Sequence, residues 1–130
     1  MHAPTLSFDV VIIGAGASGL MCAATAGQRG RRVLVLEKAN KPGKKILMSG
    51  GGRCNFTNYQ VEADNFISAN PHFCKAALKR YTQWDFISLI ERHAVEYEAR
   101  RHSPLFCRRS ARDVLHILLA ECAAAGVEIR

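Results

Sequence analysis

The sequence predicts an α/β fold in which a helix joins two parallel strands, because two apolar runs flank a segment of small residues. Residues 8–13 (FDVVII) and 33–36 (VLVL) are β-branched runs without alternation, a pattern typical of parallel strands covered on both faces. Residues 17–29 carry Leu, Met and Ala at helical spacing, and Gly30 can end that helix. We therefore predict a right-handed β-α-β unit over residues 8–37, with its first strand in the centre of a sheet.

A membrane span or a secretory signal is the competing interpretation of this region, because residues 10–28 carry no charge. A signal would usually follow basic residues, whereas Asp9 precedes the run and no Lys or Arg does. Three glycines in the middle of the run would weaken a continuous spanning helix repeatedly. Strand, turn and buried helix is therefore the prediction, and no membrane partner is expected.

Residues 38–58 are predicted to form a long loop. Glycine and lysine dominate this segment, and no helical or strand period is sustained beyond one turn of helix near residues 44–48. A compact domain seldom keeps such a loop without a ligand or a partner to order it.

Helices are expected in the segment 70–93. Asn70 and Pro71 suit an N-cap and a first-turn proline, which predicts a helix to about residue 81. Thr82 with an aspartate three residues later predicts a second helix, to about residue 93. The aromatic residues of this region recur at helix-like spacing and are predicted to be core: Tyr81, Trp84 and Phe86.

The remainder of the chain is predicted to alternate strands with one helix. Ser110 and Asp113 form a capping-box pattern for a helix over residues 111–125. Short strands are also predicted at residues 95–98, 105–107 and 127–130.

Composition and charge restrict the class of protein and its partners. The 130 residues are 48% hydrophobic and 22% charged, as in soluble globular proteins. Eighteen Lys and Arg against eleven Asp and Glu give a net charge of +7, which favours anionic partners such as nucleotide phosphates, nucleic acid or acidic lipid. A basic solvated surface explains the same charge without any partner.

The five cysteines fit a reducing compartment. They form no CxxC pair, and an odd number suits a disulfide framework poorly, so we predict a cytoplasmic protein. Cysteine and histidine spacings do not match a structural zinc site, and we predict no metal.

The turn after the first strand has the spacing of a dinucleotide-binding fingerprint. Gly14 would make the tight turn, Gly16 would let the backbone approach a pyrophosphate, and Gly19 would permit close packing of helix on strand. Free amides at the start of the helix would then hold the diphosphate.

Glu37 strengthens that assignment. It ends the second strand, eighteen residues after Gly19, where a carboxylate can accept hydrogen bonds from both ribose hydroxyls. A carboxylate there would also repel a 2′-phosphate, so NADP is not expected at this site. FAD and NAD both remain possible from these residues.

The following string, KPGKKILMSGGGRCNFTN, favours FAD over NAD. Its successive glycine amides can form an anion-binding nest and Arg53 supplies a fixed charge, so the loop could wrap the rest of a long cofactor. The alternative is a flexible basic loop.

This string, placed after a VLVLEK strand end, resembles the BaiN-like flavoproteins, a family usually labelled NAD(P)/FAD-dependent oxidoreductases and sometimes aminoacetone-oxidase-like. The GGGRCN-x-TN core carries the resemblance. The segment FCRRSARDV at residues 106–114 is also similar, although the family commonly has Phe-Pro where this chain has Phe106-Cys107.

The resemblance implies a Rossmann-like FAD-binding domain of the two-dinucleotide-binding-domain flavoprotein type, of which residues 1–130 are the N-terminal part, truncated before the fold is complete. FAD is the implied cofactor and NAD(P)H a potential electron donor. Binding to the pyrophosphate is implied for the turn, Gly14, Gly16, Ala17, Ser18 and Gly19. The resemblance places Glu37 on the adenosine ribose, Lys38 beside the adenine, and Lys45, Arg53 and Asn55 near the diphosphate, ribityl chain or flavin.

Function is thus expected to be flavin-mediated hydride or electron transfer with NAD(P)H or a small-molecule substrate or acceptor. The sequence names no catalytic acid or base, and Cys54 shows no partner thiol for a disulfide mechanism. The alternatives are an NAD-dependent dehydrogenase domain, an inactive truncated remnant, and a basic nucleic-acid-binding module. Nucleic acid is the least expected partner, because aromatic residues are not interleaved with the basic segments.

Overall fold

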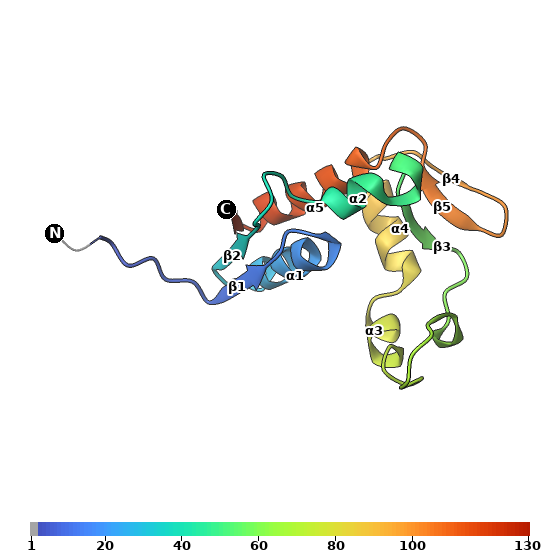
Figure 1. Cartoon of the computed structure of the whole chain (residues 1–130), viewed down its shortest axis with the longest axis horizontal. Helices are drawn as coiled ribbons and strands as arrows, with labels where there is room; N and C mark the ends of the chain where they lie inside the picture. The colour runs from blue at the N-terminus through green and yellow to red at the C-terminus, as the bar shows by residue number, and fades with distance from the viewer. Residues whose placement is uncertain (1–2) are drawn as a thin grey trace. The chain divides into compact units, whose positions relative to one another are not determined.

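The computed structural model describes residues 3–130, which divide into two compact units. The first unit comprises the chain up to Leu47 together with Leu115–Arg130, and the second comprises Met48–Val114. Figure 1 shows the elements of each unit, with α2 (Lys44–Met48) and α5 (Arg112–Ala124) at the two crossings between them in sequence.

The first unit is built on a parallel sheet. Its strands are β1 (Val10–Ile13), β2 (Val33–Leu36) and β6 (Glu128–Ile129), in the order β1-β2-β6. This order is the three-stranded half of a doubly wound dinucleotide-binding fold, with β6 as its third strand. The predicted α/β Rossmann-like class and its parallel strands are therefore confirmed, although the second unit lies between β2 and β6 in the sequence.

The prediction that the first strand is central and covered on both faces is wrong. Within the described residues β2 has a neighbour on each side, whereas β1 lies at the edge. Val11 and Ile13 are 53% and 80% exposed, while Val33 and Val35 of β2 are buried. An apolar run without alternation indicates a parallel strand, but it does not determine how many neighbours that strand has.

Helix α1 (Ala17–Gln28) packs on this sheet through small residues. Ala23 and Ala24 are buried, and a Cβ at Gly27 would lie 2.8 Å from the Cβ of Ala125, just beyond α5. Because α1 approaches its neighbours this closely, Ala23 and Ala24 are buried inside the protein and need no membrane to cover them. Among residues 3–130, no helix is both long enough and apolar enough to cross a bilayer.

The second unit combines an antiparallel sheet with short helices. Its sheet order is β3-β5-β4, and Ile87, Ile90 and Leu105 lie in its core. Its elements are η1 (Ser49–Gly52), β3 (Asn55–Asn58), η2 (Ala63–Asn65), α3 (Lys75–Arg80), α4 (Gln83–Arg92), β4 (Tyr97–Ala99) and β5 (Pro104–Cys107).

Two predictions in this unit need correction. The predicted loop 38–58 contains strand β3, whose pairing with β5 is interrupted by a bulge between Asn55 and Thr57, so it showed no clear period. The helix predicted from Asn70 begins only at Lys75, because the Asn70 side chain accepts the N–H of His72 and holds a turn instead.

The other predicted elements are present with small shifts at their ends. Helix α2 matches the predicted turn of helix at residues 44–48, and α5 falls within the predicted 111–125. Strand β6 lies within the predicted 127–130 and has a parallel partner in β2. Because helix and strand ends depend on local caps and fraying, shifts of one or two residues are ordinary.

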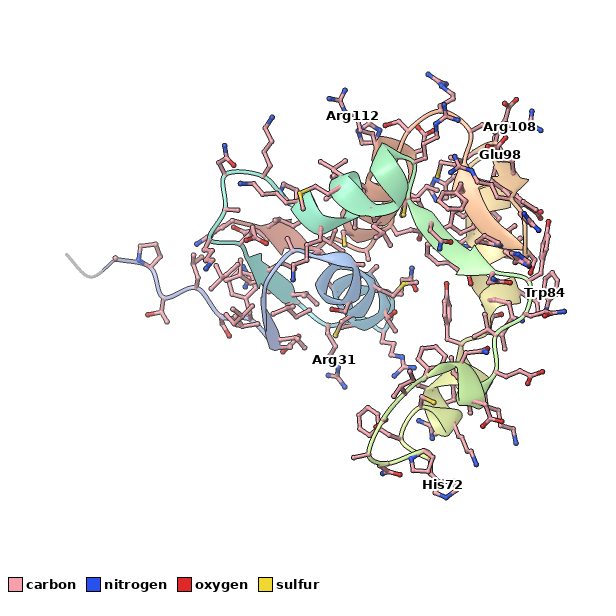
Figure 2. The ribbon with its side chains drawn as sticks, turned by 45° about the vertical axis from the view of Figure 1, so that its right-hand side comes forward. Arg31, His72, Trp84, Glu98, Arg108 and Arg112 are labelled. Carbon is pink, nitrogen blue, oxygen red and sulfur yellow. The ribbon has the colours of Figure 1, made fainter. Side chains whose placement is uncertain are left out.

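The aromatic residues near α4 are not all core. Trp84 is 55% exposed and Tyr81 43%, so their predicted burial is wrong, whereas Phe86 packs on Phe56 with ring centroids 5.9 Å apart. Figure 2 shows the Trp84 side chain at the surface, where it stacks on Tyr59 at 5.8 Å. The helical spacing indicated one apolar face, but the rings of Trp84 and Tyr81 lie outside that face.

Helix α4 offers a direct test of the predicted capping box. The Thr82 hydroxyl accepts the Asp85 N–H, and the Asp85 carboxylate accepts the Thr82 N–H at 2.7 Å. Thr82→Ala should lower the free energy of unfolding by about 1 kcal/mol, because one helix N–H loses its acceptor. Thr82→Ser should stay near the wild type in urea denaturation. Equal stability of the alanine and serine variants would contradict this role.

Candidate cofactor site

The turn between β1 and α1 is shaped by two of the predicted glycines. Gly14 has a φ of +102° and donates its N–H to Leu36 O at 2.7 Å. A Cβ at Gly19 would lie only 2.1 Å from Gly14 O, so helix and turn meet with no room for a side chain. The turn and packing roles predicted for Gly14 and Gly19 are confirmed.

Gly16 leaves the start of α1 open. It is the N-cap residue and provides no side-chain cap, and a Cβ built on it meets nothing within 4 Å. The first turn, which contains Ala17 and Ser18, carries no acidic side chain. Uncapped amides at the positive end of a twelve-residue helix form an arrangement suited to an anion.

Glu37 connects the end of β2 to this turn. Its Oε2 accepts the Ala15 N–H at 2.8 Å and its Oε1 accepts the Ala39 N–H at 3.0 Å. The Ala39 amide, followed by the Ala15 amide, lowers the pKa of the Glu37 carboxyl. Each carboxylate oxygen keeps acceptor capacity for a ligand hydroxyl, so the same side chain can organise the turn and bind ribose.

The basic loop after β2 returns to the glycine turn. Gly43 donates its N–H to Ala15 O at 2.8 Å, which holds the start of α2 beside the turn. Together they enclose a pocket of about 290 Å³, near the lower limit for ligand sites. It is lined by Ala15, Gly16, Glu37, Ala39, Lys41, Gly43, Lys44 and Lys45.

Three of the predicted binding residues thus meet at one pocket: Gly16, Glu37 and Lys45. The pocket also contains Lys41 and Lys44, which the sequence reasoning did not select. The KPGKK string held the signal for them, but only the fold shows which lysines border the cavity.

Three of the other predicted residues lie outside this pocket. Lys38 is exposed and does not line it, although its amide and its charge help to lower the pKa of Glu37. Arg53 and Asn55 belong to the second unit, where both are exposed and Asn55 lines a separate pocket. With its amide oriented to suit its neighbours, Asn55 donates to Thr57 O at 3.0 Å, which supports the bulge in β3.

Cys54 has a neighbouring thiol that the sequence did not reveal. Asn55 pairs with Phe106 across β3 and β5, and Cys107 donates its N–H to Arg53 O, so Cys54 and Cys107 occupy adjacent cross-strand positions. Both thiols are free and buried. Burial raises the pKa of Cys54, and burial together with the nearby Cys54 raises the pKa of Cys107 to about 11. At neutral pH both are protonated and weakly nucleophilic.

Comparison with known proteins gives a consistent family match. Residues 8–130 match the family described as HI0933-like protein Rossmann domain. The chain is 54% identical over 123 residues to the ribosomal RNA dihydrouridine synthase of Escherichia coli K12, which covers 95% of this chain and 31% of that protein. The Haemophilus influenzae protein of the same name is 48% identical over 119 residues, covering 92% of this chain and 30% of its own length.

A solved structure agrees on the fold. The 3-ketosteroid-delta4-(5alpha)-dehydrogenase from Rhodococcus jostii RHA1 superposes with a TM-score of 0.60 at 15% identity, over 95% of this chain and 37% of that one. The chain thus spans about a third of the length of the relatives that it matches.

Alkylation should separate the five thiols by burial. Exposed Cys22 should react first, whereas Cys54, Cys107 and Cys122 should react only slowly at neutral pH. Because its raised pKa keeps Cys107 protonated, its rate should still be rising well above the ordinary thiol pKa of about 8.5. Mass spectrometry of peptides from timed iodoacetamide reactions measures each rate. Rapid labelling of Cys54 or Cys107 at neutral pH would contradict their burial.

Glu37 should contribute a pH-dependent part of the stability. A carboxyl whose folded-state pKa is lowered stabilises the fold above its unfolded pKa of about 4.3, and this contribution disappears as the pH falls through the lowered folded value. Glu37→Gln should therefore be less stable than the wild type at neutral pH, and the difference should shrink in acid. Urea denaturation across this range measures it. A difference that does not depend on pH would reject the role of the charge.

Proposed function

Because the chain belongs to the HI0933-like Rossmann-domain family, we propose that it forms the FAD-binding part of a flavin-dependent oxidoreductase. The observation that carries this proposal is the Glu37 carboxylate, which accepts the Ala15 N–H inside the glycine turn while it borders the basic pocket. One residue thereby joins the predicted ribose site to the predicted pyrophosphate site.

The residues of the first unit fit the adenosine diphosphate half of such a cofactor. The start of α1 would bind the pyrophosphate through its amides, and the open space at Gly16 would let the phosphates approach the backbone. Glu37 would accept hydrogen bonds from the ribose, and Lys41, Lys44 and Lys45 would balance the diphosphate charge. A bound FAD would supply two-electron hydride chemistry, while the protein supplies position and electrostatics.

FAD is favoured over NAD by the loop after β2. Its residues Lys41, Gly43, Lys44 and Lys45 border the pocket, so a long cofactor could continue from the turn along the basic segment. An NAD-dependent dehydrogenase domain stays the alternative, since the glycine turn and Glu37 suit either dinucleotide. NAD(P)H as the electron donor also stays a prediction.

Titration with FAD and NADH separates these hypotheses. The purified chain should quench flavin fluorescence with saturation and should bind FAD more tightly than NADH. Gly16→Val should raise the FAD dissociation constant by about tenfold or more, because the side chain would fill the space left for the pyrophosphate. Ala120→Val, at an exposed position on α5, is the matched control and should bind like the wild type. Tight NADH binding without FAD binding would reject the proposal.

Reduction of a base in RNA is a second candidate function. Two relatives named ribosomal RNA dihydrouridine synthase are 54% and 48% identical to more than nine-tenths of this chain, and the net charge of +7 suits a polyanionic substrate. Such a reaction would add a hydride from a reduced flavin, together with a proton, across the 5,6 double bond of uracil, and the flavin would be oxidised. The dihydrouridine content of ribosomal RNA from cells that lack the gene tests it, and unchanged content would reject this candidate.

A further inference from the structure

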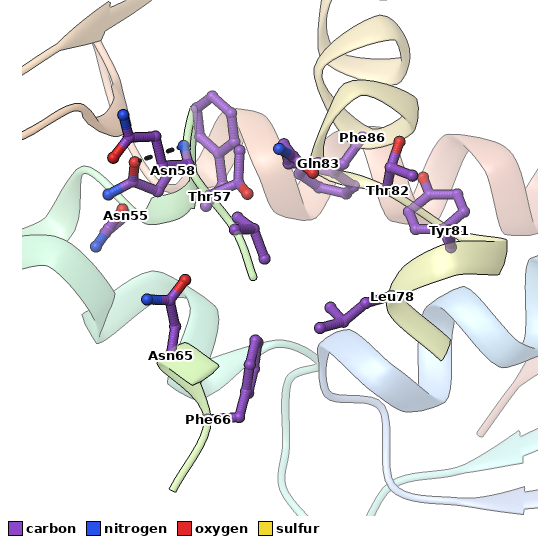
Figure 3. Close-up of a pocket in the computed structure, with 13 residues that line it drawn as sticks. Asn55, Thr57, Asn58, Asn65, Phe66, Leu78, Tyr81, Thr82, Gln83 and Phe86 are labelled. Carbon is purple, nitrogen blue, oxygen red and sulfur yellow. Dashed lines mark hydrogen bonds between the residues drawn. The ribbon is translucent and has the colours of Figure 1, made fainter. Parts of the chain in front are cut away.

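A second pocket lies wholly within the second unit, separate from the glycine turn. It has a volume of about 780 Å³, well inside the range of ligand sites, and it is bordered by β3, η2 and the segment from α3 to α4. Figure 3 shows Asn65 and Phe66 on one side and Leu78 and Tyr81 on the other. Its size is that of a site for a small ligand.

The lining of this pocket selects for an uncharged ligand. All thirteen lining residues are neutral: they carry amides, hydroxyls, aromatic rings or aliphatic chains. A carboxylate or phosphate inside it would meet no opposite charge from these side chains. A flat polar ring, by contrast, would meet aromatic faces and amide edges together.

Two side-chain amides of the lining keep a polar atom available to a ligand. Asn58 is fully engaged, because its Oδ1 accepts Ser103 Oγ and the Gln60 N–H, and its Nδ2 donates to His102 O. Asn65 uses only its Oδ1, which accepts the Glu62 N–H at 2.8 Å, so within the described residues its Nδ2 is a free donor. Among residues 3–130, Gln83 uses only its Nε2, which donates to Tyr59 O at 3.0 Å, and its Oε1 is a free acceptor.

The free amide donor of Asn65 suits the edge of a uracil-type ring. Such an edge alternates carbonyl acceptors with an N–H donor, and Asn65 Nδ2 can donate to one of those carbonyls. The aromatic rings of Phe66 and Tyr81, 47% and 43% exposed, supply faces on which a ring can stack. An isoalloxazine ring shares this edge chemistry with a uracil base.

The charges beside the pocket favour a ring that belongs to a nucleic acid over the ring of a flavin. Lys79 and Arg80 are exposed on α3, next to the pocket residue Leu78. On the opposite side Asp64 lies on η2 and Glu62 is its N-cap residue, next to the lining residues Val61 and Asn65. A phosphate backbone would therefore pass along α3, where it meets cations, while the base enters the neutral pocket.

We propose that this pocket binds an unstacked uracil base of single-stranded RNA, with Asn65 donating to its edge and Phe66 on its face. The proposal rests on the RNA-reducing candidate function and assigns its substrate site to the second unit. The exposed Tyr59–Trp84 stack adjoins the lining residues Gln60 and Gln83 and offers a platform for a neighbouring base.

The single tryptophan provides the readout, because Trp84 adjoins the pocket residue Gln83. Uridine, which carries no phosphate, should quench its fluorescence with saturation, and a short single-stranded oligouridylate should bind more tightly. Asn65→Asp keeps the oxygen that accepts the Glu62 N–H but removes the free donor, so it should raise the uridine dissociation constant about tenfold. Phe66→Ala should raise it at least about fivefold.

Asn70→Asp is the matched control, since Asn70 also accepts a backbone N–H through Oδ1 but lies outside the pocket. It should bind uridine like the wild type, and circular dichroism should show all three variants folded. Absence of saturable uridine binding to the wild type would overturn the proposal, as would equal losses in Asn65→Asp and Asn70→Asp.

Riboflavin distinguishes the two sources of the ring. Riboflavin should not displace uridine from this pocket. If riboflavin does displace uridine, and Asn65→Asp weakens that displacement, the pocket binds the flavin and the proposal is overturned. FAD binding that responds to Gly16→Val, without uridine binding, would reject this proposal but support the cofactor function. Uridine binding that depends on Asn65, without FAD binding, would support the pocket and reject the cofactor function.

Discussion

The hydrogen bond from Ala15 N–H to the Glu37 carboxylate is the contact on which the rest of the first unit depends. It joins the turn after β1 to the end of β2 and thereby holds the start of α1 at the sheet edge. The same turn receives Gly43 from the basic loop, through its contact with Ala15 O. One buried alanine backbone is therefore the point at which strand end, helix start and loop meet.

This arrangement shows how a small set of backbone constraints can produce an anion site. Gly19 brings helix and turn into van der Waals contact, while Gly16 leaves the helix start without a cap. Lys41, Lys44 and Lys45 of the following loop line the same pocket as Gly16. The Glu37 carboxylate, the one acidic group among the described residues that line this pocket, stays charged because backbone amides stabilise it.

The second unit supplies a different chemical environment. Its pocket is neutral and aromatic where the pocket of the first unit is basic, so the two pockets suit ligands of different charge. Cys54 and Cys107 lie in the core of this second unit, where burial favours a packing role over a redox one.

The sequence by itself determined the elements whose causes are local. Glycine spacing predicted the turn before α1, and the Thr82–Asp85 pair predicted the start of α4, because both depend on interactions within a few residues. It also placed Glu37 at a strand end, but not on the Ala15 amide twenty-two positions away.

Only the tertiary structure decided the features that depend on distant contacts. It put β1 at the sheet edge, placed Lys41 and Lys44 at the basic pocket, and brought Cys54 beside Cys107. It also showed that Trp84 is a surface ring beside a pocket. Periodicity reports which residues prefer burial, whereas strand order and loop closure determine which of them meet, and those arise from pairing across the whole chain.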